Sequence, residues 1–270
     1  MLNRNTSGAA IVTFLVSAVL PLSAAVTALP GTINWVEGQV TVDGAAIPAG
    51  GPEVARVNLR EALETAQGKA EILLTPGVFL RVDERSAIKM SGTLQALRVE
   101  LLRGDALLEV AQIDRRHSLD VLDHGADARA EKDGVYVFSM GGIYVRSGKL
   151  RVEDDRRIVT FGKGEELLLD HESGRKPRKA DARESDAIYA WSESRAKYVA
   201  VASEWSAELV LASLLTLDRT SAHEAAWYWN PWFDSWAFAP AKNYQRGPFG
   251  YGYYSPAAMQ NTTPVFADSR

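Results

Sequence analysis

Between Ile33 and Asp170, a short pattern recurs in which a glycine is followed by four to six β-branched, aromatic or alternately apolar residues. The glycines that open these segments are Gly38, Gly68, Gly77, Gly104, Gly134, Gly142, Gly148 and Gly164. Alternation places every second side chain on one face of a strand, and glycine supplies the positive φ that a tight turn needs. Residues 33–170 are therefore predicted to form an all-β core, arranged as a short-stranded sandwich, a roll or a short solenoid.

A different periodicity follows over residues 185–217, where apolar residues recur at spacings of three and four. Its members are Ile188, Trp191, Tyr198, Ala202, Trp205, Leu209 and Ala212. Residues at these spacings share a helix face, so the pattern predicts one long amphipathic α-helix, with Asp181 and Glu184 as a capping box at its start. We expect the apolar stripe to pack on the β core. The alternative is that it docks on a partner protein or on a membrane surface.

The C-terminal part, residues 221–270, combines many aromatic residues with many glycines and prolines. Glycine and proline at this density oppose a long helix or a central strand, whereas a solvated tail would expose a large apolar area. We therefore expect an irregular aromatic tail that is docked. Its rings are candidates for contact with a partner protein or a glycan, because they offer broad apolar faces with polar tips. These candidates are Trp227, Trp229, Trp232, Trp236, Tyr251 and Tyr253.

Residues 1–28 have the features of a signal peptide. Arg4 precedes an apolar stretch from Ala9 to Leu22, which is shorter than the roughly 20 residues that a permanent membrane-spanning helix needs. Small residues follow, so we expect cleavage after Ala25 or Ala28 and export to the periplasm or the exterior. The alternative is an uncleaved N-terminal anchor.

Composition and charge narrow the classes of function. The chain has 270 residues, a formal net charge of −4 and no cysteine. The lack of cysteine excludes disulfides, thiolate metal sites and cysteine catalysis. The mixed charge provides no general basic field, so nucleic acid is not an expected partner. Residues 171–184 are locally basic, and we interpret them as a solvated linker, with an anion-binding or phospholipid-facing patch as the alternative.

Sequence motifs for catalysis or metal binding are missing. The four histidines are His117, His124, His171 and His223, and none has the spacing of a helical zinc motif. Asp120 and His124 would share a face only on a helix, whereas their segment has the pattern of a strand and a turn. A Gly-x-Ser-x-Gly elbow and a phosphate-binding loop are also absent. We therefore predict that the protein is not an enzyme and has no catalytic residue, metal or cofactor.

The central stretch resembles the FecR domain family over about residues 35–170. The resemblance is carried by glycines and alternating apolar positions in the segments Leu63–Leu74, Gly77–Asp83, Val99–Val110 and Ile143–Val152. It implies an extracytoplasmic β domain. Family members of the classical type regulate sigma factors, with a cytoplasmic anti-sigma segment before one membrane helix and a β domain that senses an outer-membrane receptor.

This chain departs from that plan, because only about eight residues precede the apolar stretch of the leader. We therefore expect a FecR-like β domain without the cytoplasmic anti-sigma segment. The predicted function is that of an exported, non-enzymatic cell-envelope module that binds another envelope protein in signalling or assembly. The alternative is a glycan- or peptidoglycan-binding protein that uses the aromatic tail.

Overall fold

The computed structural model describes residues 28–51, 55–139, 141–154, 157–169, 176–180, 186–214 and 224–259. The predicted signal peptide, the capping box, His171 and His223 therefore lie outside the described residues, apart from Ala28. The side chains of Leu209 and Ala212 lie outside them as well.

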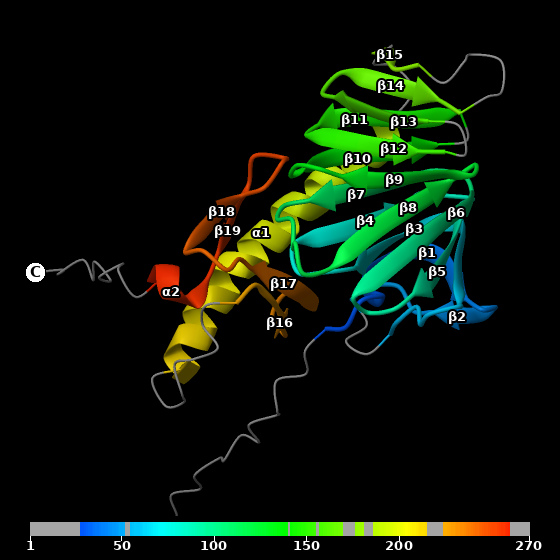
Figure 1. Ribbon diagram of the computed structural model, residues 1–270. Helices are drawn as coiled ribbons and strands as arrows, with labels where there is room; N and C mark the ends of the chain where they lie inside the picture. Colours follow the sequence, from blue (N-terminus) through cyan, green and yellow to red (C-terminus); the bar gives the residue numbers. More distant parts are fainter. Residues whose placement is uncertain are drawn as a thin grey trace, which may run out of the picture.

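Strands β1 to β15 form one sheet (Figure 1). Their bounds are β1 Thr32–Val42, β2 Ala45–Ile47, β3 Ala62–Leu73, β4 Val78–Val82, β5 Ala87–Gly92, β6 Ala96–Arg103, β7 Ala106–Val110, β8 Ser118–Asp123, β9 Ala126–Ala130, β10 Gly134–Ser139, β11 Gly142–Ser147, β12 Lys149–Glu153, β13 Ile158–Gly162, β14 Glu165–Leu168 and β15 Arg178–Lys179. The order is β13-β12-β9-β8-β6-β5-β3-β4-β7-β10-β11-β14-β15, with β1 paired to β2 and β3. All pairs are antiparallel except β6 with β8.

The sheet folds over at β1 and β3, so that its two arms face each other across the main core. Leu80 and Phe138 enter this core from one arm, and Val99 and Val152 enter it from the other. The all-β core that the alternating pattern predicted is therefore confirmed, in the form of a folded-over sheet.

Two glycines permit the close approach of β1 and β3 where the register between the strands shifts. Gly38 has a φ of 65°, and a Cβ atom there would lie 2.0 Å from the carbonyl oxygen of Gln67. A Cβ atom on Gly68 would lie 2.4 Å from the carbonyl oxygen of Glu37. Any side chain at either position would collide with the opposite backbone, so both positions require glycine.

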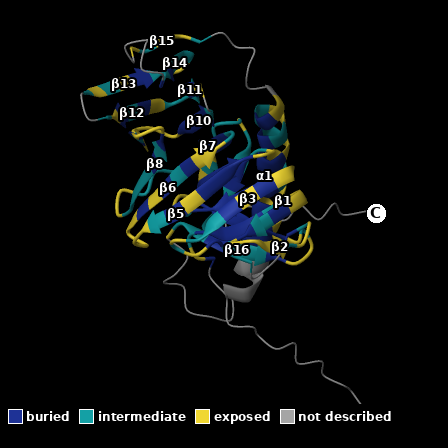
Figure 2. Cartoon of the chain, turned by 90° about the vertical axis from the view of Figure 1, so that its right-hand side faces the viewer, coloured by how far each residue is buried: buried dark blue, intermediate teal, exposed yellow. Residues whose placement is uncertain are grey.

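The second face of strands β3, β4, β7 and β10 is covered by α1 (Asp186–Leu214) and by the C-terminal segment. This segment forms the hairpin of β16 (Ala226–Asn230) and β17 (Ser235–Ala239), the hairpin of β18 (Tyr244–Arg246) and β19 (Gly252–Tyr254), and the short helix α2 (Pro256–Met259). Figure 1 shows both hairpins beside α1. Every residue of β4 and β7 is therefore buried. Figure 2 shows the dark blue of buried residues concentrated in the middle of the sheet, and yellow mainly in loops and outer parts of the molecule.

The expected irregular tail thus contains short regular elements. Glycines and prolines lie at or near its turns, and the aromatic residues lie mainly in the short strands. Part of the expected solvated linker is also ordered, because Arg178–Lys179 adds β15 to the sheet and Arg178 pairs with Glu166 at 2.7 Å. Among the described residues, no helix is both long and apolar enough to cross a membrane.

The buried face of α1 differs from the predicted apolar stripe. Ile188 and Ala202 are buried as expected, but Trp205 is 53% exposed. The buried face instead carries small or polar side chains, namely Ser192, Arg195, Ala196, Val199, Ser203 and Ser206. Small side chains on this face leave room for the bulky rings of the C-terminal segment, and Trp205 lies toward solvent while Trp191 and Tyr198 are half-buried.

Candidate interaction surface

Three charged side chains lie on neighbouring strands, on the face of the sheet that α1 covers. They are Glu71 on β3, Arg81 on β4 and Glu109 on β7, and all three are fully buried. Arg81 Nε donates to Glu71 Oε2 at 2.8 Å, and Arg81 Nη1 donates to Glu109 Oε2 at 2.7 Å. The neighbouring positions on each strand enter the main core, so strand alternation alone directs these charges to the opposite face.

The helix and the segments at both ends of the chain complete this network. Arg195 of α1 donates to Glu71 Oε1 at 3.0 Å, and the Tyr253 hydroxyl donates to Glu109 Oε1 at 3.2 Å. Asn34 Nδ2 donates to Glu71 Oε1 at 2.8 Å, while Asn34 Oδ1 accepts from the backbone N–H of Trp236 at 2.7 Å. The network therefore joins the sheet to α1 and to the C-terminal hairpins.

The two buried carboxylates have opposite pKa shifts. Burial opposes the ionised form of Glu71, but the guanidinium groups of Arg195 and Arg81 lower its pKa to about 2. Burial raises the pKa of Glu109 and outweighs the opposing effect of Arg81. Burial and the neighbouring Glu109 carboxylate raise the pKa of Tyr253 well above its ordinary value. Because the charges pair with one another across β3, β4, β7 and α1, we assign this network to holding the parts of the molecule together.

Sequence reasoning missed this network, although a signal was present. Each of the three strands carries one charge between apolar residues, as in Ala70–Ile72, Leu80–Val82 and Leu108–Val110. A charge in the middle of a strand that is buried on both faces requires an opposite charge beside it. The partner Arg195 could not be found in this way, because its pairing depends on how α1 lies on the sheet.

The structure separates the predicted contact residues into three groups, which are buried, half-buried and exposed. Trp227, Trp236 and Tyr253 are buried, so their rings are not available to a ligand in this conformation. They pack instead around Phe79 of the sheet, with the Trp227 and Tyr253 ring centroids at 5.0 and 6.2 Å from it. Trp229 and Tyr251 are half-buried.

Trp232 differs from the other candidates, because it is 69% exposed. It lies in the turn between β16 and β17, directly before Phe233, whose ring contacts Tyr198 and Trp205 of α1. We define the aromatic surface as Trp35, Tyr198, Val201, Trp205, Trp232 and Phe233. Its ring contacts are Trp35 with Tyr198 at 6.1 Å, Tyr198 with Phe233 at 5.5 Å and Phe233 with Trp205 at 6.2 Å between centroids.

Hydrogen bonds from buried groups hold this surface in place. Asn230 is fully buried, and its Nδ2 donates to the Ala202 carbonyl at 3.3 Å and to Ser206 Oγ at 3.1 Å, both on α1. Asn230 Oδ1 accepts the backbone N–H of Trp232 at 3.1 Å. The Tyr198 hydroxyl donates to the Phe233 carbonyl at 2.6 Å. The turn is therefore fixed to the helix while it presents Trp232 to solvent.

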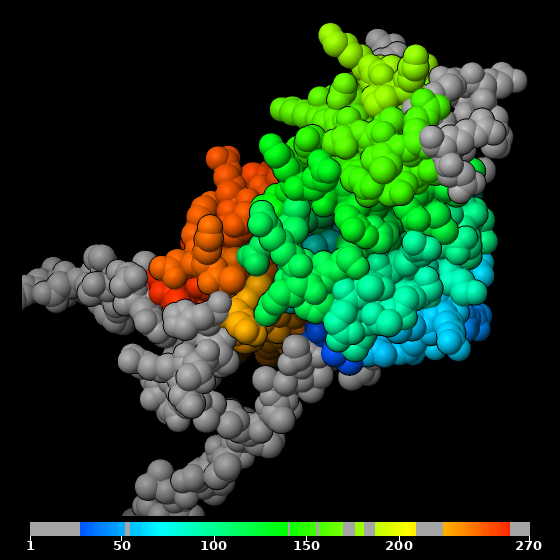
Figure 3. Space-filling view, viewed as in Figure 1, coloured from blue at the N-terminus to red at the C-terminus, as the bar shows by residue number. Residues whose placement is uncertain are grey.

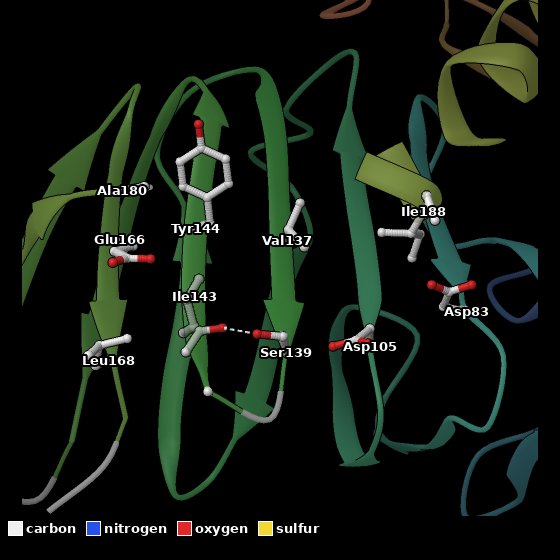
Figure 4. Close-up of a pocket in the computed structure, with 13 residues that line it drawn as sticks. Asp83, Asp105, Val137, Ser139, Ile143, Tyr144, Glu166, Leu168, Ala180 and Ile188 are labelled. Atoms are coloured by element: carbon white, nitrogen blue, oxygen red, sulfur yellow. Dashed lines mark hydrogen bonds between the residues drawn. The ribbon is translucent and has the colours of Figure 1, made fainter. Parts of the chain in front are cut away.

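A small cavity of about 130 Å³ lies near the first turn of α1, between the ends of β4, β7, β10, β11 and β14 (Figure 4). Three carboxylates line it, with Asp83 and Asp105 at one end and Glu166 at the other. Lys69 pairs with Asp83, and Arg178 pairs with Glu166 at 2.7 Å. Burial and the neighbouring Asp83 raise the pKa of Asp105. Two of the three carboxylates are already neutralised, so this cavity is a weaker candidate site than the aromatic surface.

The two described histidines make local contacts. His117 Nδ1 lies 2.8 Å from Asp114 Oδ2, and His124 Nδ1 lies 2.6 Å from Asp123 Oδ1. His124 has a φ of 45°, as expected for a turn residue. Within the described part of the chain, no group of three histidine, aspartate or glutamate side chains is placed to hold a metal ion.

Comparisons with known proteins give a limited result. No protein-family model matches the chain, and no curated protein matches it. Two crystal structures of a "putative anti-sigma factor" from Parabacteroides distasonis ATCC 8503 are similar to it at 17% and 16% identity, each with a TM-score of 0.39. Each similarity covers 48% of this chain and spans 62% or 63% of the length of the solved chain.

Proposed function

We propose that this chain is a non-enzymatic module of the cell envelope, FecR-like in kind, that binds another envelope protein in signalling or assembly. The observation that carries the proposal is the aromatic surface, where a large ring is fixed in an exposed position. Exposed apolar area of this kind is costly in water and is typical of interaction sites. The signal-peptide pattern of residues 1–28 supports the location.

The charges beside the aromatic surface favour a protein or a glycan over a lipid surface. Glu204 and Glu208 are exposed on α1 next to Trp205. Carboxylates at these positions would repel the anionic headgroups of a bacterial membrane. A protein partner would bury Trp205 and Trp232 as the centre of an interface, where tryptophan contributes more than most residues.

The proposal is tested by placing a photo-crosslinking amino acid at position 232 in cells that produce the full chain. Leu102 on β6 is 48% exposed and apolar, so the same replacement there is the matched control. We expect a discrete, protease-sensitive adduct in the envelope fraction from position 232 and none from position 102. Equal labelling from the two positions would contradict a specific site.

A glycan-binding function is the second candidate, because exposed Trp232 and Trp205 offer faces on which sugar rings can stack. Sedimentation with purified, protein-free peptidoglycan distinguishes it from protein binding. A glycan site predicts that the chain sediments with peptidoglycan and that Trp232→Ala reduces the bound fraction several-fold. If position 232 gives no protein adduct and the chain does not sediment with peptidoglycan, a binding role for this surface is excluded.

A further inference from the structure

One end of the sheet is formed by β13, and no other described strand covers its outer edge. Among the strands that the structure describes, β13 pairs only with β12, so its other side is a sheet edge. Its sequence is Ile-Val-Thr-Phe-Gly, without charge or proline. The end of the molecule that contains β12 to β15 stands clear of the C-terminal segment in the space-filling view (Figure 3).

The hydrogen-bond pattern shows which backbone groups of β13 face outward. The Asp154 N–H donates to the Arg157 carbonyl at 3.0 Å, and the Glu131 N–H donates to the Lys149 carbonyl at 2.8 Å. Along β12, even-numbered residues therefore direct their backbone groups toward β13 and odd-numbered residues toward β9. With the register Val152↔Val159, the N–H and C=O groups of Ile158 and Thr160 point away from the sheet.

These outward groups have no hydrogen-bond partner among the described residues. The next outward N–H, that of Gly162, is already bonded to Glu165 Oε2 at 2.7 Å. The Ile158 side chain is 55% exposed beside them. The edge therefore offers two donors, two acceptors and an apolar contact to an incoming strand.

Other edges of the same sheet are blunted, which makes β13 distinctive. β15 has only two residues, Arg178 and Lys179, and they follow Pro177. β2 has only three residues, and Pro48 follows it. Short length, lysine and proline are the usual means by which a protein prevents pairing at a sheet edge.

The charges at the two ends of β13 indicate what could pair with it. Arg157 and Lys163 flank the strand, and within the described residues neither forms an ion pair, whereas neighbouring Arg151 is paired with Glu153 at 2.7 Å. In an antiparallel pair of two copies centred on Thr160, Arg157 of each copy would face Lys163 of the other. Like charges opposite each other disfavour this self-pairing.

We propose that the free edge of β13 binds an extended segment of another protein that carries acidic residues at its two ends, about six positions apart. The segment would add one strand to the sheet through the backbone groups of Ile158 and Thr160, and its acidic residues would face Arg157 and Lys163. This binding is independent of the aromatic surface, and either surface can function without the other.

Two synthetic peptides test the proposal with the full chain. Both contain alternating valine and threonine, one between two glutamates six positions apart and the other between two lysines. Fluorescence anisotropy at low salt should show at least about tenfold tighter binding of the glutamate peptide, because only its charges are opposite to those of the edge. In the double variant R157E/K163E, the order of the two affinities should reverse.

Thr160 provides a variant that acts on the edge alone. Thr160→Pro removes an outward N–H and leaves the bonds between β12 and β13 in place, whereas Thr160→Val keeps that N–H as the matched control. We expect Thr160→Pro to weaken binding of the glutamate peptide at least about fivefold and Thr160→Val to change it little. Circular dichroism and the melting temperature would verify that both variants fold.

Three results would overturn the proposal. The first is no binding of the glutamate peptide to the wild-type chain at millimolar concentration. The second is equal binding of the glutamate and lysine peptides. The third is equal binding of the glutamate peptide by folded Thr160→Pro and Thr160→Val. Because the peptides report on β13 only, none of these results bears on the crosslinking test at position 232.

Discussion

Glu71 is a buried carboxylate to which three separate elements of the fold donate hydrogen bonds. It accepts hydrogen bonds from Arg81, Arg195 and Asn34, which come from a neighbouring strand, from α1 and from β1. A buried carboxylate is tolerated only because these donors replace the water that it loses. Removing its charge would leave two buried guanidinium groups with too few partners.

Glu71→Gln is therefore expected to lower the free energy of unfolding by about 3–5 kcal/mol at pH 7. Glu64→Gln is the matched control on the same strand, because Glu64 pairs with Arg103 where both side chains are half-exposed. That pair should contribute less than about 1 kcal/mol. Denaturant unfolding followed by tryptophan fluorescence measures both variants, and equal losses would contradict a special role for Glu71.

The stability difference between the wild-type chain and Glu71→Gln should depend on pH with a defined sign. The pKa of Glu71 is about 2 in the folded chain and 4.5 ordinarily, so its stabilising contribution is complete above pH 4.5 and is lost as the pH falls toward 2. The stability difference between wild type and Glu71→Gln should therefore shrink over this interval. The raised pKa of Glu109 acts in the opposite direction, and because the Glu71 carboxylate is one cause of that rise, the rise should be smaller in Glu71→Gln.

Where the C-terminal hairpins meet α1, the helix carries the small buried side chains of Ala202, Ser203 and Ser206, and these determine how closely the hairpins approach it. Ser203 Oγ donates to the Phe238 carbonyl at 2.6 Å and accepts the Tyr254 N–H at 3.0 Å. Contacts of this length require both hairpins to lie against the helix. A large side chain on the same face would force the two apart.

Ala202→Leu is predicted to cost about 1–3 kcal/mol, because Ala202 is fully buried between α1 and the β16–β17 hairpin. Val201→Leu is the control one residue away, where the side chain is 41% exposed, and it should change stability by less than about 0.5 kcal/mol. Thermal unfolding compares the two. A loss as large for Val201→Leu would mean that the exposed face of α1 is also packed.

At the scale of the whole molecule, the folded-over sheet, α1 and the C-terminal hairpins share one set of contacts. Asn34, near the beginning of the chain, accepts a hydrogen bond from the backbone N–H of Trp236, and Arg195 of α1 donates one to Glu71. Without α1 and the C-terminal segment, the second face of the sheet would expose Leu73 and Phe79. We therefore expect the described parts of the chain to unfold together.

Truncation at Ser221 tests this expectation. The shortened chain should unfold at a lower denaturant concentration and should bind a hydrophobic dye, because the cluster around Phe79 loses Trp227, Trp236 and Phe238. Dye fluorescence and denaturant unfolding of the two chains measure the effect. A truncated chain of unchanged stability that binds no dye would show that the C-terminal segment contributes nothing to the fold.

The strands and the helix could be predicted from the sequence because their signals are local. Gly77 followed by alternating residues predicted β4, and spacings of three and four predicted α1. The rotation of α1 could not be predicted, because tryptophan at position 205 satisfies an apolar pattern whether it is packed or exposed. The composition of the aromatic segment likewise could not predict that Trp232 is exposed while most of the other rings are buried or half-buried.

By itself, the sequence determined that an all-β core is followed by a long helix and by an aromatic segment too apolar to remain in water. Only the tertiary structure decided which rings the segment buries, which charges pair and which strand edge stays open. The physical reason is that these features depend on residues far apart in the chain, such as Asn34 with Trp236 and Glu71 with Arg195. Local propensity carries no information about such pairs, because their members meet only after the sheet has folded over and α1 has packed on it.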